Sequence, residues 1–98
     1  MGKFKEIISA PTPTLVDFFA TWCGPCKTMS PVLDELKKVY GEKIRIIKID
    51  VDKNPAIADQ FKIRGVPTLM LFKESKMLWR ESGALPLSTL KQKIGGYL

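Results

Sequence analysis

A short apolar run passes directly into a pair of closely spaced cysteines, and this junction constrains the fold more than any other feature. Residues 15–20 read Leu-Val-Asp-Phe-Phe-Ala, a pattern typical of a buried strand. Residues 22–27 then read Trp-Cys-Gly-Pro-Cys-Lys. From Met29 to Tyr40, apolar residues recur at steps of three and four, which predicts an amphipathic helix ending at Gly41. The two cysteines are therefore expected where a strand turns into a helix.

The rest of the chain also alternates between helical and extended patterns. Apolar side chains within residues 3–9 have helical spacing, and only five residues separate Ser9 from Leu15. A parallel strand would need a longer crossover, so we expect a helix there. The remaining predicted elements are a strand over 44–51, a short helix from Asn54-Pro55 to 61, a hairpin of strands 68–72 and 77–81, and a helix over 86–97.

Composition limits the classes to which the chain can belong. Its 98 residues are 45% hydrophobic and 27% charged, which is ordinary for a single globular domain spanning residues 1–98. No apolar stretch reaches the ~18 residues of a membrane span, and the N-terminus lacks the apolar core of a signal peptide. We expect a cytoplasmic protein, although a removed targeting segment stays open. The net charge of +6 is spread without a basic cluster, so no nucleic-acid partner and no membrane partner is predicted.

Two cysteines separated by two residues have three interpretations: a redox pair, half of a zinc site, or an inert coincidence. Structural zinc needs four ligands, and the chain has no histidine and no third cysteine, so no metal site is predicted. The Gly-Pro dipeptide between the cysteines argues against coincidence. In a strand–helix setting, the pattern favours a thiol–disulfide redox pair.

The predicted helix start explains why such thiols would react. Free N–H groups and the positive end of the helix dipole stabilise a thiolate, which is the attacking species. Lys27 adds positive charge. We expect Cys23, at the exposed start, to attack a partner's disulfide, and Cys26, more buried, to resolve the mixed disulfide.

Two of the charged residues within predicted strands look misplaced. Asp17 and Lys48 interrupt the runs 15–20 and 44–51, and an isolated buried charge is expensive unless it is paired or has a shifted pKa. One interpretation is that each faces solvent. The other places a protonatable carboxyl beneath Cys26, where it accepts the proton of that thiol. Pro67, before the third strand, is compatible with either a trans or a cis bond.

Together these residues resemble the thioredoxin family. The resemblance covers residues 15–98 and implies a three-layer α/β/α sandwich with a mixed sheet and helices on both faces. About fourteen residues precede Leu15, so the usual first strand is expected to be missing. The sheet would then have four strands, with 44–51 at an edge protected by charge. The matching segments are 16–27, 48–52, 54–55, 64–68 and 82–84.

The resemblance also implies roles for particular residues. Pro67 would be cis and pack against the disulfide, and Val66 would offer its backbone to an extended substrate. Asp17 and Lys48 would form a buried carboxyl–ammonium pair behind Cys26, completing a catalytic set with Cys23. The substrate-binding surface would comprise Trp22, Gly24, Pro25, Val66, Pro67, Gly83 and Ala84.

The function implied is that of a monomeric protein-disulfide reductase. It would be recycled by a thioredoxin reductase, which holds the NADPH and FAD, while the domain itself binds no cofactor. The Gly-Pro dipeptide resembles reducing members of the family, near ~−270 mV, rather than oxidants near ~−120 mV. An isomerase or oxidant, and a binding subunit whose redox chemistry is incidental, stay open as alternatives. A dimer through the edge strand is also left open.

Overall fold

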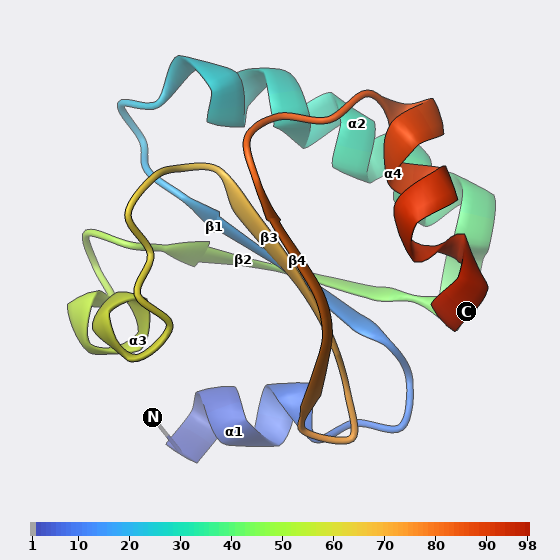
Figure 1. Cartoon of the computed structure of the whole chain (residues 1–98), viewed down its shortest axis with the longest axis horizontal. Helices are drawn as coiled ribbons and strands as arrows, with labels where there is room; N and C mark the ends of the chain where they lie inside the picture. The colour runs from blue at the N-terminus through green and yellow to red at the C-terminus, as the bar shows by residue number, and fades with distance from the viewer. Residues whose placement is uncertain (1) are drawn as a thin grey trace.

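The computed structural model describes residues 2–98, and its elements follow the predicted order of helices and strands (Figure 1). The predicted C-terminal helix divides into an α-helix and a short 3₁₀ turn, and Gly41 ends the long helix as expected. The elements are α1 (Gly2–Ile8), β1 (Thr14–Phe19), α2 (Gly24–Tyr40), η1 (Gly41–Lys43), β2 (Arg45–Asp50), α3 (Pro55–Gln60), β3 (Thr68–Lys73), β4 (Lys76–Ser82), α4 (Leu87–Ile94) and η2 (Gly95–Tyr97).

The four strands form one mixed sheet in the order β2-β1-β3-β4. β1 is parallel to β2 and antiparallel to β3, while β4 returns antiparallel to β3. The four-strand prediction is confirmed, and β2 is an edge strand. The β1–β2 register places Asp17 beside Lys48.

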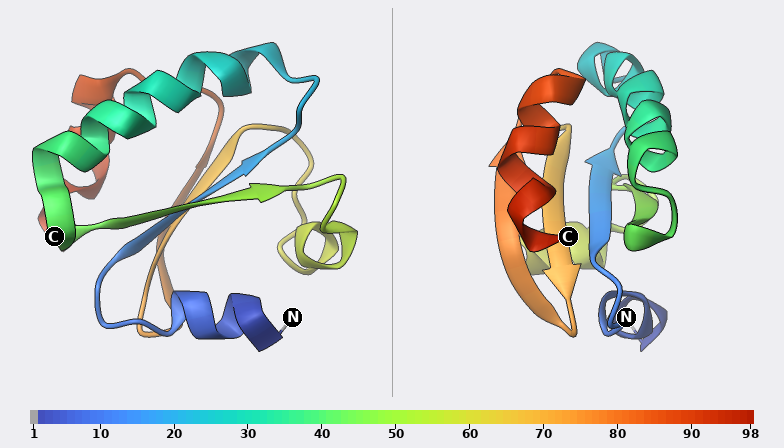
Figure 2. Two further views of the ribbon diagram at one scale, coloured as in Figure 1. Left: turned by 180° about the vertical axis from the view of Figure 1, so that it is seen from behind. Right: turned by 90° about the vertical axis from the view of Figure 1, so that its right-hand side faces the viewer.

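Helices cover both faces of the sheet, which confirms the three-layer prediction (Figures 1 and 2). On one face, α2 and α4 enclose a mainly aliphatic cluster; on the other, α1 and α3 enclose an aromatic one. The aliphatic cluster comprises Leu15, Met29, Leu33, Leu36, Ile44, Leu69, Leu71, Leu90 and Ile94. The aromatic cluster comprises Phe4, Ile8, Val16, Phe18, Ile57, Met70 and Phe72, with Phe61 packed against it.

The β2 edge has side chains bonded to both of its ends. Lys37 Nζ donates to Ile44 O at 2.7 Å, and Asn54 donates to Asp50 O through both its backbone N–H and its side-chain amide. Asn54 is the N-cap residue of α3, but its side chain bonds back to the strand and not to the helix. Two outer carbonyls are thereby occupied, which shortens the surface on which another strand could pair.

The β3–β4 hairpin turns without glycine. Glu74 and Ser75 both have positive φ, at 51° and 69°, the pattern of a type I′ turn. Their N–H groups donate to Ala10 O and Ile8 O at 3.0 and 2.9 Å. These bonds to the end of α1 offset the strain that non-glycine residues experience in this conformation.

Candidate active site

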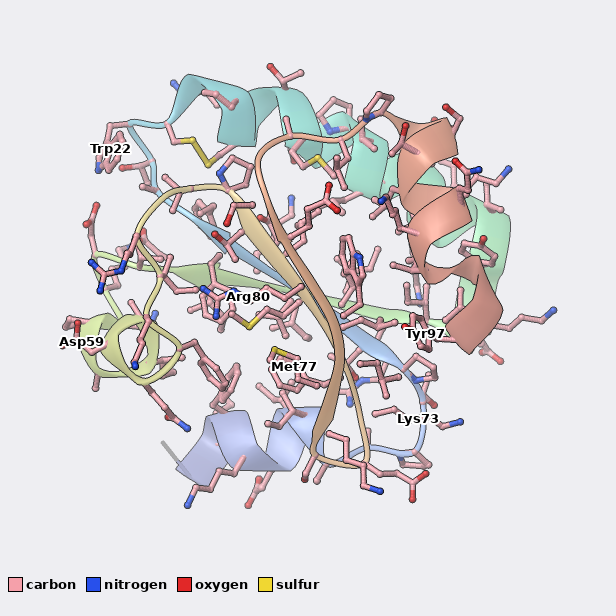
Figure 3. The ribbon with its side chains drawn as sticks, in the orientation of Figure 1. Trp22, Asp59, Lys73, Met77, Arg80 and Tyr97 are labelled. Atoms are coloured by element: carbon pink, nitrogen blue, oxygen red, sulfur yellow. A yellow bond between two sulfur atoms is a disulfide. The ribbon has the colours of Figure 1, made fainter. Side chains whose placement is uncertain are left out.

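The start of α2 holds the cysteine pair as a disulfide between Cys23 and Cys26 (Figure 3). Cys23 is the N-cap residue, and its Sγ accepts a hydrogen bond from the Cys26 N–H at 3.1 Å. Pro25 occupies the first turn, where its missing N–H leaves no helical bond unmade. The Cα atoms are 5.3 Å apart, a normal separation for a disulfide. The predicted strand-to-helix placement is therefore confirmed.

Exposure does not distinguish the two sulfurs. Cys23 is 3% exposed and Cys26 is 6% exposed, so the expectation of an exposed Cys23 and a more buried Cys26 was wrong. Val66 packs against the pair, and its carbonyl oxygen lies 3.5 Å from Cys23 Sγ. Cys26 instead lines a pocket together with Asp17. The two cysteines thus have different neighbours: Cys23 lies beside the Val66 carbonyl, and Cys26 lies beside the pocket that contains Asp17.

The loop before β3 lies across the disulfide. The Val66–Pro67 bond is cis, as the resemblance implied. Gly83 N–H donates to Pro67 O at 2.8 Å, and Thr68 Oγ1 donates to Gly65 O at 2.7 Å. The Thr68 and Ser82 hydroxyls are 3.1 Å apart. These hydrogen bonds hold the loop that carries the cis bond, and Val66 of this loop packs against Cys23.

The predicted docking residues surround this point with unequal exposure. Trp22 is 70% exposed and projects from the β1–α2 connection, and its indole N–H donates to Asp52 Oδ2 at 2.9 Å (Figure 3). Val66 is half-buried and Pro67 is buried. The exposed members are Trp22, Gly24, Pro25, Gly83 and Ala84. Their substrate-binding role remains a prediction.

Asp17 is a buried carboxyl behind the disulfide. It is 2% exposed, and its Oδ1 has no hydrogen-bond partner among residues 2–98. It lines a pocket of about 390 Å³ shared with Cys26, Lys27, Ser30 and Lys48. Burial raises the pKa of Asp17 from 3.8 to about 6, against the opposing effect of the Lys48 cation. A carboxyl in this state can exchange a proton near neutral pH.

Lys48 is not the buried partner that the resemblance implied. Its side chain is exposed, and its ammonium donates to Ser30 Oγ at 2.8 Å. Within residues 2–98, no ion pair joins Lys48 to Asp17. The lysine lies on the edge strand, so its flexible stem can carry the ammonium to the rim of the pocket, where it stays hydrated.

Comparisons with known proteins agree with this geometry. The thioredoxin family profile matches residues 1–95. The chain is 45% identical over 98 residues to thioredoxin from Pyropia yezoensis, covering 99% of this chain and 92% of that protein. A thioredoxin mutant from Halobacterium salinarum superposes with a TM-score of 0.89 at 35% identity, covering 99% and 84% of the two chains. For oxidised mitochondrial thioredoxin 3 from Saccharomyces cerevisiae, the TM-score is 0.85 at 35% identity, with 96% and 88% covered.

The chain belongs to the thioredoxin family. Thioredoxins are thiol–disulfide oxidoreductases, and the Cys23–Cys26 pair at disulfide distance is the redox centre of this one. It is accordingly a protein-disulfide reductase. No helix within residues 2–98 combines the length and apolar character needed to cross a membrane.

Two polar contacts of this thioredoxin site escaped the sequence analysis. Asp52 lies in a segment that matched the family, but nothing in the sequence connected it to Trp22, thirty residues away. Ser30 had one usable signal: it lies four residues after Cys26 and therefore on the same helix face. Its bond to Lys48 depends on how α2 crosses β2, which local pattern does not reveal.

Proposed function

We propose that this thioredoxin reduces protein disulfides with Cys23 as the attacking sulfur and Cys26 as the resolving one. The supporting observation is the N-cap position of Cys23, whose sulfur accepts the Cys26 N–H beside the Val66 carbonyl. In the dithiol form, that N–H and the helix dipole stabilise a Cys23 thiolate. An incoming disulfide therefore meets the better nucleophile at Cys23.

The proposed exchange has two balanced steps. The Cys23 thiolate attacks one sulfur of the partner's disulfide, forming a mixed disulfide and releasing the other sulfur as a thiolate. Cys26 then attacks Cys23 Sγ, closing the intrachain disulfide and releasing the partner's second thiolate. Two electrons pass to the partner in each cycle. The Trp22 and Pro25 surface, with Val66, Pro67, Gly83 and Ala84, would hold the extended segment that carries the substrate disulfide.

Asp17 is proposed to take up the Cys26 proton during the second step. The carboxyl and Cys26 line the same pocket, and the unpaired Oδ1 is free to accept a hydrogen bond directly or through water. Because burial holds the pKa of Asp17 near 6, the carboxylate is available at neutral pH. Lys48 would influence this step only by its charge.

The proposed partners are disulfide-containing proteins and a thioredoxin reductase that restores the dithiol. We propose a monomer that binds no cofactor of its own, the flavin and NADPH belonging to the reductase. A cytoplasmic location is proposed from the sequence. Relatives include spinach thioredoxin M-type, whose name places it in the chloroplast, so fractionation of cells producing the full protein would test the compartment.

Trapping tests the assignment of the two cysteines. Cys26→Ser should accumulate a mixed disulfide with an oxidised protein substrate, while Cys23→Ser should accumulate none; nonreducing gels with mass spectrometry distinguish them. The reverse result would overturn the order.

The equilibrium potential of the pair, followed by Trp22 fluorescence in defined thiol buffers, then decides between functions. A value near ~−270 mV supports a reductase, and ~−180 to −120 mV would indicate an isomerase or oxidant. Absence of a two-electron transition would leave only a binding subunit.

A further inference from the structure

Ser30 makes a contact that distinguishes it from the neighbouring hydroxyl of the same helix. Its Oγ accepts a hydrogen bond from Lys48 Nζ at 2.8 Å, linking α2 to β2. The Thr28 hydroxyl instead donates to Gly24 O at 3.5 Å, a local bond within α2. Ser30 also lines the pocket that contains Asp17 and Cys26, whereas Thr28 does not. Among the α2 hydroxyls, Ser30 is therefore the one that lines this pocket and binds the Lys48 ammonium.

Lys48 has two carboxylates within its neighbourhood. Its backbone lies beside Asp17 in the β1–β2 register, and its side chain lines the pocket of about 390 Å³ that contains Asp17. It also lines an adjacent pocket of about 410 Å³ together with the exposed Asp34. Ser30 and Asp34 are one helical turn apart on α2. Ser30 lines the pocket of Asp17 and not the pocket of Asp34, so its bond holds the ammonium on the Asp17 side.

We infer that Ser30 is a positioning residue, which holds the Lys48 ammonium within Coulombic reach of the buried Asp17 carboxyl and so tunes the proton affinity of that carboxyl. The use of Asp17 as a proton acceptor rests on the proposed function. Two elements bring titratable or charged groups to the Asp17 pocket. Helix α2 brings Cys26 and Lys27, and strand β2 brings Lys48. On β3, the residue opposite Asp17 is the neutral Leu69.

Removing the hydroxyl should move the cation away from Asp17. Direct contact with Asp17 would require the ammonium to lose its water inside the pocket, which is costly. Bulk water and the exposed Asp34 are less costly destinations. With the cation farther away, the ionised form of Asp17 is less stabilised, and its pKa should rise further. For one partly solvated charge, the expected shift is about half to one pH unit.

Carbon-13 NMR of labelled aspartate in the oxidised full-length protein measures this shift directly. Ser30→Ala should raise the Asp17 titration midpoint by about half to one unit. Ser30→Thr, which keeps the hydroxyl, should restore the wild-type midpoint, and Thr28→Ala serves as the matched hydroxyl deletion on the same helix. Alanine is a good helix former, so α2 should be retained. A midpoint that stays unchanged or falls in Ser30→Ala would overturn the inference.

A variant that lacks Lys48 tests whether the effect passes through that lysine. Lys48→Met should raise the midpoint by itself, and adding Ser30→Ala should then change nothing further. A further shift in that background would show that Ser30 acts by another route and would refute the inference. The pH profile of mixed-disulfide resolution is a separate readout. If Ser30→Ala moves the Asp17 midpoint but not that profile, Ser30 keeps its positioning role and the proposed role of Asp17 fails.

Discussion

The two faces of strand β1 differ by one buried charged side chain. Val16 and Phe18 point toward α1 and α3, where the cluster is apolar and rich in aromatic rings. Leu15, Asp17 and Phe19 alternate onto the other face, where Asp17 is a buried carboxyl with an unpaired oxygen. The same six-residue strand thus packs apolar side chains on both faces and adds a titratable group on only one of them.

This difference separates stability from chemistry. On the face covered by α1 and α3, five ring pairs among Phe4, Phe18, Phe61 and Phe72 have centroids 5.5 to 6.5 Å apart. Edge-to-face pairs are favourable at these distances. On the α2 face, burial of Asp17 disfavours its charged form. This destabilising carboxyl lies in the same pocket as Cys26. Substitutions of Phe18 and of Asp17 should therefore have opposite consequences for stability.

The largest effect is expected from Phe18→Ala. Phe18 is fully buried and contacts the rings of Phe4 and Phe61, so truncation should cost about 3 to 5 kcal/mol in the free energy of unfolding. The redox potential should stay unchanged, because Phe18 faces away from the cysteines. Urea unfolding and equilibration in thiol buffers measure the two quantities.

A milder change on the same site guards against complete unfolding. Phe18→Leu should cost about 1 to 1.5 kcal/mol, again without changing the potential. Should either variant shift the potential while the unfolding free energy stays at the wild-type value, the division between the two faces would be disproved.

Asp17→Asn should act in the opposite direction. Between pH values of about 4 and 6, the folded state binds more protons than the unfolded state, because burial raises the pKa of Asp17 from 3.8 to about 6. Stability therefore falls as pH rises through this window and is about 3 kcal/mol lower above it. Removing the charge should make the variant about 1 to 2 kcal/mol more stable at pH 8, after the cost of burying an amide.

The same variant should slow resolution of the mixed disulfide more than initial attack, since Asn cannot accept the Cys26 proton. Denaturation at pH 4 and pH 8 checks the stability gain, which should disappear at pH 4. Stopped-flow single-turnover kinetics check the rates. Asp59→Asn, at an exposed position on α3, is the control. A stability gain equal at both pH values would contradict the assigned titration.

The order of elements was predictable because most of the necessary signals are local. Steps of three and four identified α2, the continuous apolar run identified β1, and Gly41 marked a helix end. The short spacing before Leu15 excluded a parallel first strand on purely geometric grounds. The cysteine pair was identifiable from its two-residue spacing, and Asp17 was identifiable because it is a charged residue within an apolar run.

The features that were missed depend on contacts between distant segments. Cys23 is buried because the loop carrying Val66 crosses it, forty-three residues later. Lys48 is exposed because β2 is an edge strand, and Ser30 acquires a role only because that lysine reaches α2. The turn at Glu74 is stabilised by carbonyls at the end of α1. None of these contacts leaves a periodic trace in the sequence.

The smallest effect is expected at the outer layer of the aromatic face, from Phe4→Leu. Helix α1 has only seven residues, too few to be stable alone, and Phe4 anchors it against Phe61 and Phe72. Leucine keeps most of the apolar contact but loses these ring pairs, so the cost should be about 1 kcal/mol. Weaker docking of α1 should also free the Ser75 N–H, which bonds to Ile8 O.

Amide hydrogen exchange can localise this loss. Ser75 should exchange faster in Phe4→Leu, whereas Ile94→Val, a matched small deletion in α4 on the opposite face, should cost a similar 0.5 to 1.5 kcal/mol and leave Ser75 protected. Equal acceleration of Ser75 in both variants would mean that α1 opens only with the whole molecule. The two sides of the sheet would then unfold as one cooperative unit. They would differ in the titration of Asp17 and not in their local stability.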